Sequence, residues 1–199
     1  MEIKRFIGGI LEANGYVVTD GRSGLCWVID PGYQPKRFTQ YLRKENLRAK
    51  AILLTHHHGD HSGAAEQLRR ETGCELIIHR ADADAYGGDV DVYLEGGETL
   101  TCGELTCRVI HTPGHTRGGC CFCVPKYRVC FTGDTVFNVD LGRTDLEDGS
   151  IEEMERSIRQ VVDAWPNDVR IYPGHGDDCT MKTVRKINQE FLNIVEEGK

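Results

Sequence analysis

The sequence predicts a fold that mixes α-helices and β-strands, and it predicts this arrangement twice along the chain. Short apolar runs bounded by Gly, Pro, Asn and Asp indicate strands. Stretches with apolar residues at helical spacing indicate amphipathic helices. Each half opens with strands and continues with a helix, a strand and a helix, although the halves share no sequence identity. The length of 199 residues suits one domain, which we expect to span residues 1–199.

The elements of the first half follow from their end signals. Gly21 and Gly24 mark a turn between the second and third strands, and Gly73 ends the second helix. In order, we expect strands at residues 3–11, 14–19 and 25–30, a helix at 35–46, a strand at 51–54, a helix at 62–72, a strand at 75–79, and a short helix with a surface loop at 80–97.

The second half is expected to repeat this order. Ser150 and Glu153 form a capping box that begins a helix, and Pro166 ends it. Before it we expect strands at 98–102, 105–111, 119–124 and 127–132 and a loop at 134–149; after it we expect a strand at 169–172 and one last helix from residue 180. The apolar stripes of the two helices comprise Ile151, Met154, Ile158, Val161 and Val162 in the first, and Val184, Ile187, Phe191 and Ile194 in the second.

The composition excludes several kinds of partner. The net charge is -7 and there is no Lys/Arg cluster, which argues against a nucleic acid as the main partner. No apolar run approaches the ~20 residues that a membrane helix needs. The first residues lack the apolar segment of a secretion signal, so we expect a cytoplasmic protein without a membrane partner. The oligomeric state stays open.

The nine cysteines are expected to be reduced, buried thiols. Their number is odd, and a cytoplasm keeps thiols reduced. Cys120 and Cys123 form one C-x-x-C pair, but they lie in an expected strand, where side chains alternate between faces. We therefore do not expect a structural zinc site there.

A dense group of ligand-type side chains follows the strand at 51–54. His56, His58, Asp60 and His61 come within six residues, and Gly59 is expected to allow a tight turn among them. Imidazole nitrogen and carboxylate oxygen are ligands that zinc and iron(II) accept. A polar loop of surface histidines is the alternative interpretation.

Three further ligand-type residues follow strands of the second half. His115, Asp134 and His175 each come shortly after an apolar strand and directly after a Gly. One such residue alone would be unremarkable. Four strand ends in the right order favour a metal site.

The pattern His-x-His-x-Asp-His at residues 56–61, with the three later residues, resembles the metal motif of metallo-β-lactamase-fold hydrolases. This resemblance implies an α+β fold, a four-layer α/β/β/α sandwich with the metal site at its edge. It also implies a role for each residue. His56, His58 and His115 would hold one metal, Asp60, His61 and His175 a second, and Asp134 would bridge both. Asp30 would orient ligands by hydrogen bonds. His57 would point away, and His79 and His111 would be structural or surface residues.

The implied cofactors are two divalent metal ions, zinc in the first place, with iron or manganese as alternatives. Two metals that share a water lower its pKa toward 7, and the resulting hydroxide attacks a carbonyl carbon. Asp60 and Asp134 are then the catalytic candidates. No Gly-x-Ser-x-Gly elbow is present. The reaction expected is hydrolysis of an activated acyl bond.

Within this family the segments at 56–61, 111–116, 132–137 and 141–145 are similar to those of short glyoxalase II-like proteins. This implies a thioesterase for a small molecule such as S-lactoylglutathione. The full-length enzyme has an additional C-terminal helical domain with basic groups, whereas this sequence has one expected helix after His175. Arg143, and after it Arg117, are the candidate residues for binding an anionic substrate.

Three other functions remain open at this stage. A persulfide dioxygenase would use one iron(II), held by His56, His115 and Asp134. A lactonase would use the same two-metal chemistry on a cyclic ester. A non-catalytic metal or thiol sensor would use the cysteines instead.

Overall fold

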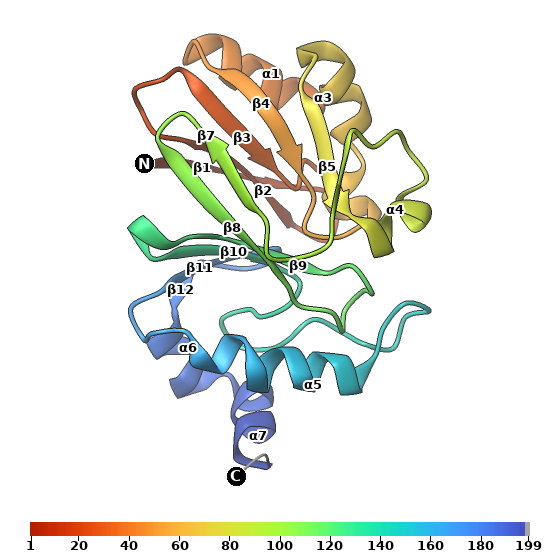
Figure 1. Ribbon diagram of the computed structural model, residues 1–199, viewed down its shortest axis with the longest axis vertical. Coiled ribbons are helices and arrows are strands. Elements are labelled where there is room, and N and C mark those ends of the chain that lie inside the picture. The colour runs from red at the N-terminus through yellow and green to blue at the C-terminus, as the bar shows by residue number, and fades with distance from the viewer. Residues whose placement is uncertain (198–199) are drawn as a thin grey trace.

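The computed structural model describes residues 1–197. Within these residues, two six-stranded sheets pack face to face, and helices cover the outer face of each sheet (Figure 1). The expected four-layer α/β/β/α sandwich is therefore confirmed. The first sheet comes from the N-terminal half of the chain and the second from the C-terminal half.

The first sheet has the strand order β1-β2-β3-β4-β5-β6. The first two pairs are antiparallel and the last three are parallel. The strands are β1 (Glu2–Gly8), β2 (Ala13–Thr19), β3 (Leu25–Ile29), β4 (Arg48–Leu53), β5 (Glu75–His79) and β6 (Val92–Leu94). β6 was not expected, because three residues at a sheet edge leave no clear apolar pattern.

The second sheet has the order β12-β11-β10-β9-β8-β7. All its pairs are antiparallel except β10 with β11. The strands are β7 (Thr99–Cys102), β8 (Leu105–His111), β9 (Cys120–Val124), β10 (Val129–Gly133), β11 (Arg170–Pro173) and β12 (Cys179–Thr180). The two-residue β12 was also not expected.

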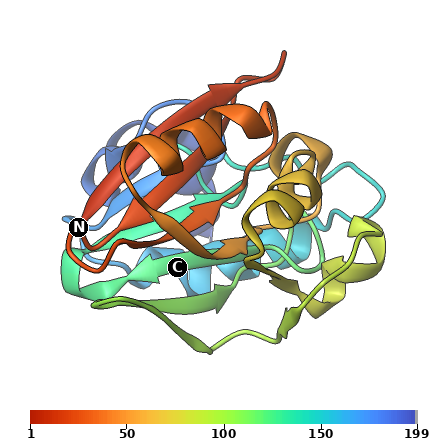
Figure 2. The same ribbon diagram turned by 90° about the horizontal axis from the view of Figure 1, so that it is seen from above.

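The helices lie on the outside (Figure 2). The first half contributes α1 (Pro35–Lys44), α2 (Gly59–Ser62), α3 (Ala65–Thr72) and α4 (Arg80–Tyr86); the second half contributes α5 (Ile151–Gln160), α6 (Met181–Ile187) and α7 (Gln189–Glu197). As expected, the Ser150 side chain caps α5 by accepting a hydrogen bond from the Glu153 N–H. Short 3-10 turns lie at Pro125–Tyr127 and Val162–Ala164.

The last helix was expected to be continuous, and this was wrong. Asn188, which is fully buried, separates α6 from α7. Its amide donates hydrogen bonds to the carbonyl oxygens of Phe137 and Asp140, and its side-chain oxygen accepts one from the Phe191 N–H. Ile187 is consequently exposed instead of joining the apolar stripe, and Ile151 in α5 is exposed too.

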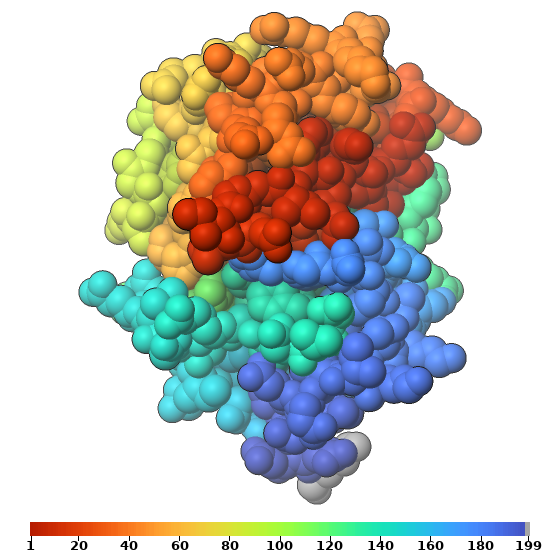
Figure 3. Space-filling model, turned by 180° about the vertical axis from the view of Figure 1, so that it is seen from behind, coloured from red at the N-terminus to blue at the C-terminus, as the bar shows by residue number. Residues whose placement is uncertain are grey.

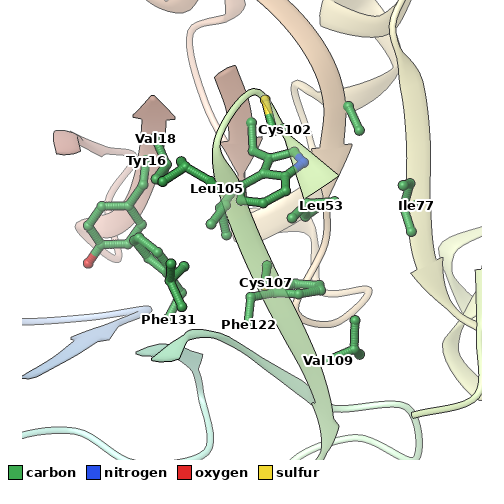
Figure 4. Close-up of a cluster of buried hydrophobic side chains, with 14 of the residues drawn as sticks. Tyr16, Val18, Leu53, Ile77, Cys102, Leu105, Cys107, Val109, Phe122 and Phe131 are labelled. Carbon is green, nitrogen blue, oxygen red and sulfur yellow. The ribbon is translucent and has the colours of Figure 1, made fainter. Parts of the chain in front are cut away.

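The main core lies between the two sheets (Figure 4). Tyr16, Val18, Leu53 and Ile77 point into it from the first sheet, and Leu105, Val109, Phe122 and Phe131 from the second. A second cluster lies between the first sheet and its helices, and a third lies between the second sheet and its helices. Since the inner faces of both sheets are buried, the ends of the strands are the places where polar side chains can gather.

One expectation about the cysteines was wrong. Cys123 and Cys130, which face each other on β9 and β10, form a disulfide. Cys120 points into the core between the sheets and is free, so the alternation expected for the C-x-x-C pair is confirmed. Among residues 1–197, no helix is long and apolar enough to cross a membrane.

Candidate metal centre

The strand directions bring the candidate ligands to one edge of the sandwich. β3 and β4 run parallel, as do β10 and β11. β8 and β10 are both antiparallel to β9, so β8, β10 and β11 point the same way. Carboxyl ends of strands with one direction lie at one edge of a sheet. The segments that follow these strands carry Asp30, residues 56–61, His115, Asp134 and His175.

Three imidazoles from both halves form a first group. Nitrogen atoms of His56, His58 and His115 all lie within 4.8 Å of one another. His58 Nδ1 is 2.9 Å from His115 Nε2. Three converging imidazole nitrogens match the ligand set of many zinc and iron sites.

Asp60, His61 and His175 form a second group of the same size. His175 Nε2 lies 3.3 Å from His61 Nε2 and 3.3 Å from Asp60 Oδ2. One carboxylate and two imidazoles are again a common ligand set.

Asp134 lies between the two groups. Its Oδ2 is 3.5 Å from His115 Nε2 and 3.5 Å from His175 Nε2. Its Oδ1 is 3.4 Å from His61 Nε2. One carboxylate therefore faces imidazoles of both groups.

Hydrogen bonds hold the imidazoles with one nitrogen turned toward the centre. Asp30 accepts hydrogen bonds from the N–H and hydroxyl of Thr55, and its Oδ2 lies 3.1 Å from His61 Nδ1. Because the Thr55 hydroxyl is already a donor to Asp30, its oxygen accepts from His56 Nδ1, at 3.0 Å. Asp30 thus orients His61 directly and His56 through Thr55.

Backbone carbonyls orient two more imidazoles. His115 Nδ1 donates to the Arg143 carbonyl at 2.7 Å, and His175 Nδ1 donates to the Leu11 carbonyl at 2.9 Å. Since Nδ1 of each ring is engaged with a carbonyl, Nε2 is the nitrogen that faces the centre.

Two polar atoms test whether these residues fit a metal. His56 Nε2 and Asp134 Oδ1 are buried and have no hydrogen-bond partner. A buried polar atom without a partner destabilises a fold by about 1–3 kcal/mol. Both atoms belong to the converging set, so a cation bound between the groups would satisfy them. The residues present fit a metal.

Burial favours the neutral form of two imidazoles in the first group. Burial, the largest influence, lowers the pKa of His56 well below its ordinary value. Burial and the neighbouring His115 lower the pKa of His58 to about 4. Neutral imidazoles are the form that binds a metal.

The second group is dominated by its carboxylates. Burial lowers the pKa of His61, but Asp134 and Asp30 outweigh burial and raise this pKa to about 9. Burial likewise lowers the pKa of His175, and hydrogen bonds with Asp134 and Asp60 raise it to about 10. These carboxylates attract positive charge, which a bound metal would supply.

Close approach of the backbone requires glycine at position 174. A Cβ there would lie 2.1 Å from Asp134 Oδ1 and 2.6 Å from His61 Cε1. The expectation for Gly59 was wrong, since a Cβ there would meet nothing within 4 Å. The loop turns instead because residues 59–62 form the single helical turn α2.

The fold and this geometry agree with a comparison against known families. Residues 8–175 match the metallo-beta-lactamase superfamily. The chain belongs to this superfamily.

Several known proteins resemble most of the chain. The hydroxyacylglutathione hydrolase GloC of Haemophilus influenzae is 33% identical over 184 residues, which cover 83% of this chain and 86% of GloC. The probable polyketide biosynthesis zinc-dependent hydrolase BaeB of Bacillus velezensis is 35% identical over 162 residues, 80% of this chain and 71% of BaeB. The solved structure of TTHA1623 in a di-iron-bound form has a TM-score of 0.82 and 30% identity, and the match covers 93% of this chain and 98% of that one. The resemblance to glyoxalase II-like members is confirmed, and these proteins identify the general class as metal-dependent hydrolases.

A pocket of about 640 Å³ opens over the metallo-beta-lactamase site. Residues of both groups line it, together with Phe137, Val139, Arg143 and Leu146. The expected substrate residue Arg143 is thus at the pocket, but its guanidinium pairs with both oxygens of Asp145, at 2.7 and 2.8 Å. Arg117 is not among the residues that line the pocket and lies 3.5 Å from Asp148.

The remaining histidines lie outside the two groups. His57 Nδ1 is 3.1 Å from Asp82, and its Nε2 is 3.6 Å from Asp148. His79 and His111 stack on each other with ring centroids 4.1 Å apart.

Two positioning residues of this metallo-beta-lactamase fold were missed in the sequence. Buried Asn14 donates hydrogen bonds to the carbonyl oxygens of Pro173 and Gly176, on either side of His175. Buried Asp82 accepts hydrogen bonds from the His57 and Gly118 N–H groups and from the Thr116 hydroxyl. Neither lies near a ligand in the sequence, so no local pattern marks them.

Proposed function

We propose that the protein is a metal-dependent thioesterase that cleaves a small thioester such as S-lactoylglutathione and uses two divalent metal ions, zinc in the first place. The position of Asp134 is the observation that supports this most. Its two oxygens face His61 and His175 on one side and His115 on the other. A single-metal site would need only one of these groups.

The proposed ligand assignment follows the two groups. His56, His58 and His115 would hold one metal, and Asp60, His61 and His175 would hold the other. Asp134, which lies between the two groups, would serve both. When bound, two such ions lower the pKa of a shared water and polarise a substrate carbonyl.

The residues of the chain position the reactants. Asp60 lines the pocket and accepts a hydrogen bond from the attacking water, which it orients toward the carbonyl carbon. Asp30 and Thr55 keep His56 and His61 turned inward through the hydrogen bonds described above. These contacts fix the site before the substrate arrives.

The proposed thiol leaving group needs no proton donor. Among residues 1–197, the residues that line the pocket include no Ser, Cys, Lys or Tyr, so no side-chain nucleophile of the usual kind and no Lys or Tyr acid is present. A thiol has a pKa of about 8.5, so it leaves as a thiolate without a proton. An amine leaving group would need an acid.

The test combines metal analysis with two assays on one sample purified without oxygen. About two metals per chain and hydrolysis of S-lactoylglutathione support the proposal. About one iron per chain and oxygen uptake with glutathione persulfide would instead establish the dioxygenase alternative. In that case Asp60, His61 and His175 would lose their proposed role.

A further inference from the structure

Exposed apolar side chains gather at the mouth of the pocket. Leu11, Val139 and Leu146 line the pocket and are 62%, 52% and 39% exposed, and Ile10 beside them is 99% exposed. Phe137 forms the deeper part of the same wall. The residues come from the turn between β1 and β2 and from the loop at 134–149. Figure 3 shows the face on which the red N-terminal hairpin lies above the cyan loop.

Packing of the fold accounts for Phe137, which is buried with its ring centroid 5.9 Å from that of His175, but not for the exposed residues of the set. Among residues 1–197, the three hydrophobic clusters of the core include none of the residues Ile10, Leu11, Phe137, Val139 and Leu146. Single exposed apolar residues are common on proteins, but a contiguous set around a pocket marks a ligand site. We call Leu11, Phe137, Val139 and Leu146 the apolar wall.

The charges of the pocket disfavour an anionic group next to this wall. Arg143 is the one Lys or Arg among the described residues that line the pocket, and Asp145 already pairs with it. Asp140 adds a carboxylate on the same side. A glutathione moiety carries two carboxylates and one ammonium group, so it would find one cation, already engaged.

The Leu11 part of the apolar wall is fixed relative to the candidate metal ligands. The Leu11 carbonyl accepts the hydrogen bond from His175 Nδ1, and the Asn14 N–H donates to the Gly174 carbonyl at 2.7 Å. The hairpin that carries Leu11 is therefore attached to the loop that carries His175. A substrate group bound on the wall would be held at a set distance from the reacting carbonyl.

We propose that the apolar wall binds an aliphatic or aromatic acyl group, so that the substrates are acyl thioesters with an apolar acyl chain and an uncharged or remote thiol portion. This rests on the proposed thioesterase function and names its substrate class. In the reaction the carbonyl carbon forms a bond to the oxygen of water, and its bond to sulfur breaks. The products are a carboxylate, a thiol and one proton.

The test uses the metal-loaded full chain and N-acetylcysteamine thioesters of acetate, butyrate, hexanoate and octanoate. We expect kcat/KM to rise about fourfold per methylene until the wall is covered, from the transfer free energy of a CH₂ group. Leu11→Ser and Leu146→Ser should each lower the hexanoyl-to-acetyl ratio of kcat/KM about tenfold. Ile187→Ser removes an exposed apolar residue of α6 outside the pocket and should leave this ratio unchanged.

A binding measurement accompanies the kinetics. Calorimetry with a ketone analogue, in which a methylene separates the hexanoyl carbonyl from sulfur, should give a weaker Kd for both wall variants than for Ile187→Ser. Val139→Ser provides a third wall variant if another fails to fold.

The outcomes separate the two proposals. If kcat/KM does not change with the length of the acyl chain, the apolar substrate class is wrong but the thioesterase function stands. The same holds if the protein prefers S-lactoylglutathione and the wall variants do not change this preference. Failure of the metal-loaded protein to cleave any of these thioesters overturns both.

Discussion

Asn14 Nδ2 lies 2.8 Å from the carbonyl oxygen of Gly176, so a buried amide of the first sheet holds the turn that carries His175 in the second half. The same amide donates to Pro173, and the Tyr16 hydroxyl donates to that carbonyl as well. The orientation of one candidate ligand therefore depends on a residue about 160 positions earlier in the chain.

Replacing Asn14 by Ala should weaken both stability and metal binding. The carbonyls of Pro173 and Gly176 would each lose one donor and keep another, from Tyr16 and Arg5, which costs about 0.5–1.5 kcal/mol for each hydrogen bond lost. Urea unfolding of the metal-free protein measures the first effect. Titration with zinc measures the second, which we expect to be about 10–100-fold at the site that includes His175. Asn193→Ala, on the exposed side of α7, is the control and should change neither.

Asp134→Ala should remove metal from both groups. Since the carboxylate faces imidazoles on both sides, its loss should lower metal affinity by more than about a hundredfold and abolish most hydrolysis. Metal content per chain, measured after dialysis, is the test. Asp140→Ala changes a carboxylate of the same pocket outside the two groups and should retain both metals. Full occupancy in Asp134→Ala would disprove the bridging assignment.

His57→Ala and Asp82→Ala should differ, although the two side chains are neighbours. His57 lies outside both groups, so its removal should leave metal content and turnover near those of the unmodified protein. Asp82→Ala leaves the buried Gly118 N–H and the buried Thr116 hydroxyl without their hydrogen-bond acceptor, which should lower the free energy of unfolding by about 3 kcal/mol.

Thermal unfolding and metal analysis of both variants, with exposed Asp84→Ala in the same helix as control, distinguish these effects. A loss of metal in His57→Ala as large as in His56→Ala would mean that the ligand assignment in this loop is wrong.

Stability should depend on Asp20 in a pH-dependent way. This carboxylate joins two turns: it accepts from the N–H groups of Arg22 and Ser23, and across the sheets from that of Glu104. The Glu104 N–H, and then those of Ser23 and Arg22, hold its pKa well below the ordinary value. As the pH falls, the Asp20 carboxylate is therefore protonated in the unfolded chain before it is protonated in the folded protein. The stabilisation is complete above an unfolded pKa of about 3.9 and is lost as the pH falls toward the folded pKa.

Asp20→Asn should accordingly destabilise the protein by about 1.5–3 kcal/mol at pH 7, the range for hydrogen bonds to a charged group. The difference in the free energy of unfolding between Asp20→Asn and the unmodified protein should become smaller as the pH falls below 4. Urea unfolding at pH 7, 4 and 3 measures it, and differences between the two proteins cancel the contribution of the metal site. Asp89→Asn, at a surface carboxylate, should give no such gap. A gap that stays constant with pH would contradict this assignment.

Local patterns in the sequence predicted most of the strands and the candidate ligands, whereas the four layers were predicted from the resemblance to a known family. Apolar runs mark buried strands, and each ligand follows such a run within a few residues. Asn14, Asp82 and Asn188 leave no local pattern, because most of their hydrogen-bond partners are distant in the chain and become neighbours only when the chain folds. Asn188 is the clearest case. Its neighbours continue an apolar helical stripe, and only contact with the 137–140 segment shows why the helix ends there. The disulfide was missed for a different reason, since pairing of Cys123 with Cys130 depends on the register of β9 and β10.

The candidate ligands are divided between the halves of the molecule: four follow β4, and three follow strands of the second sheet. An ion held by residues of both sets would link the two sheets at the edge where the candidate ligands lie. The fold then responds to metal supply by mass action, gaining about 1.4 kcal/mol per site for each tenfold rise in free ion above the Kd. In a cell short of that ion, a larger fraction of the protein would be unfolded and degraded by proteases. The amount of protein would then fall together with its activity.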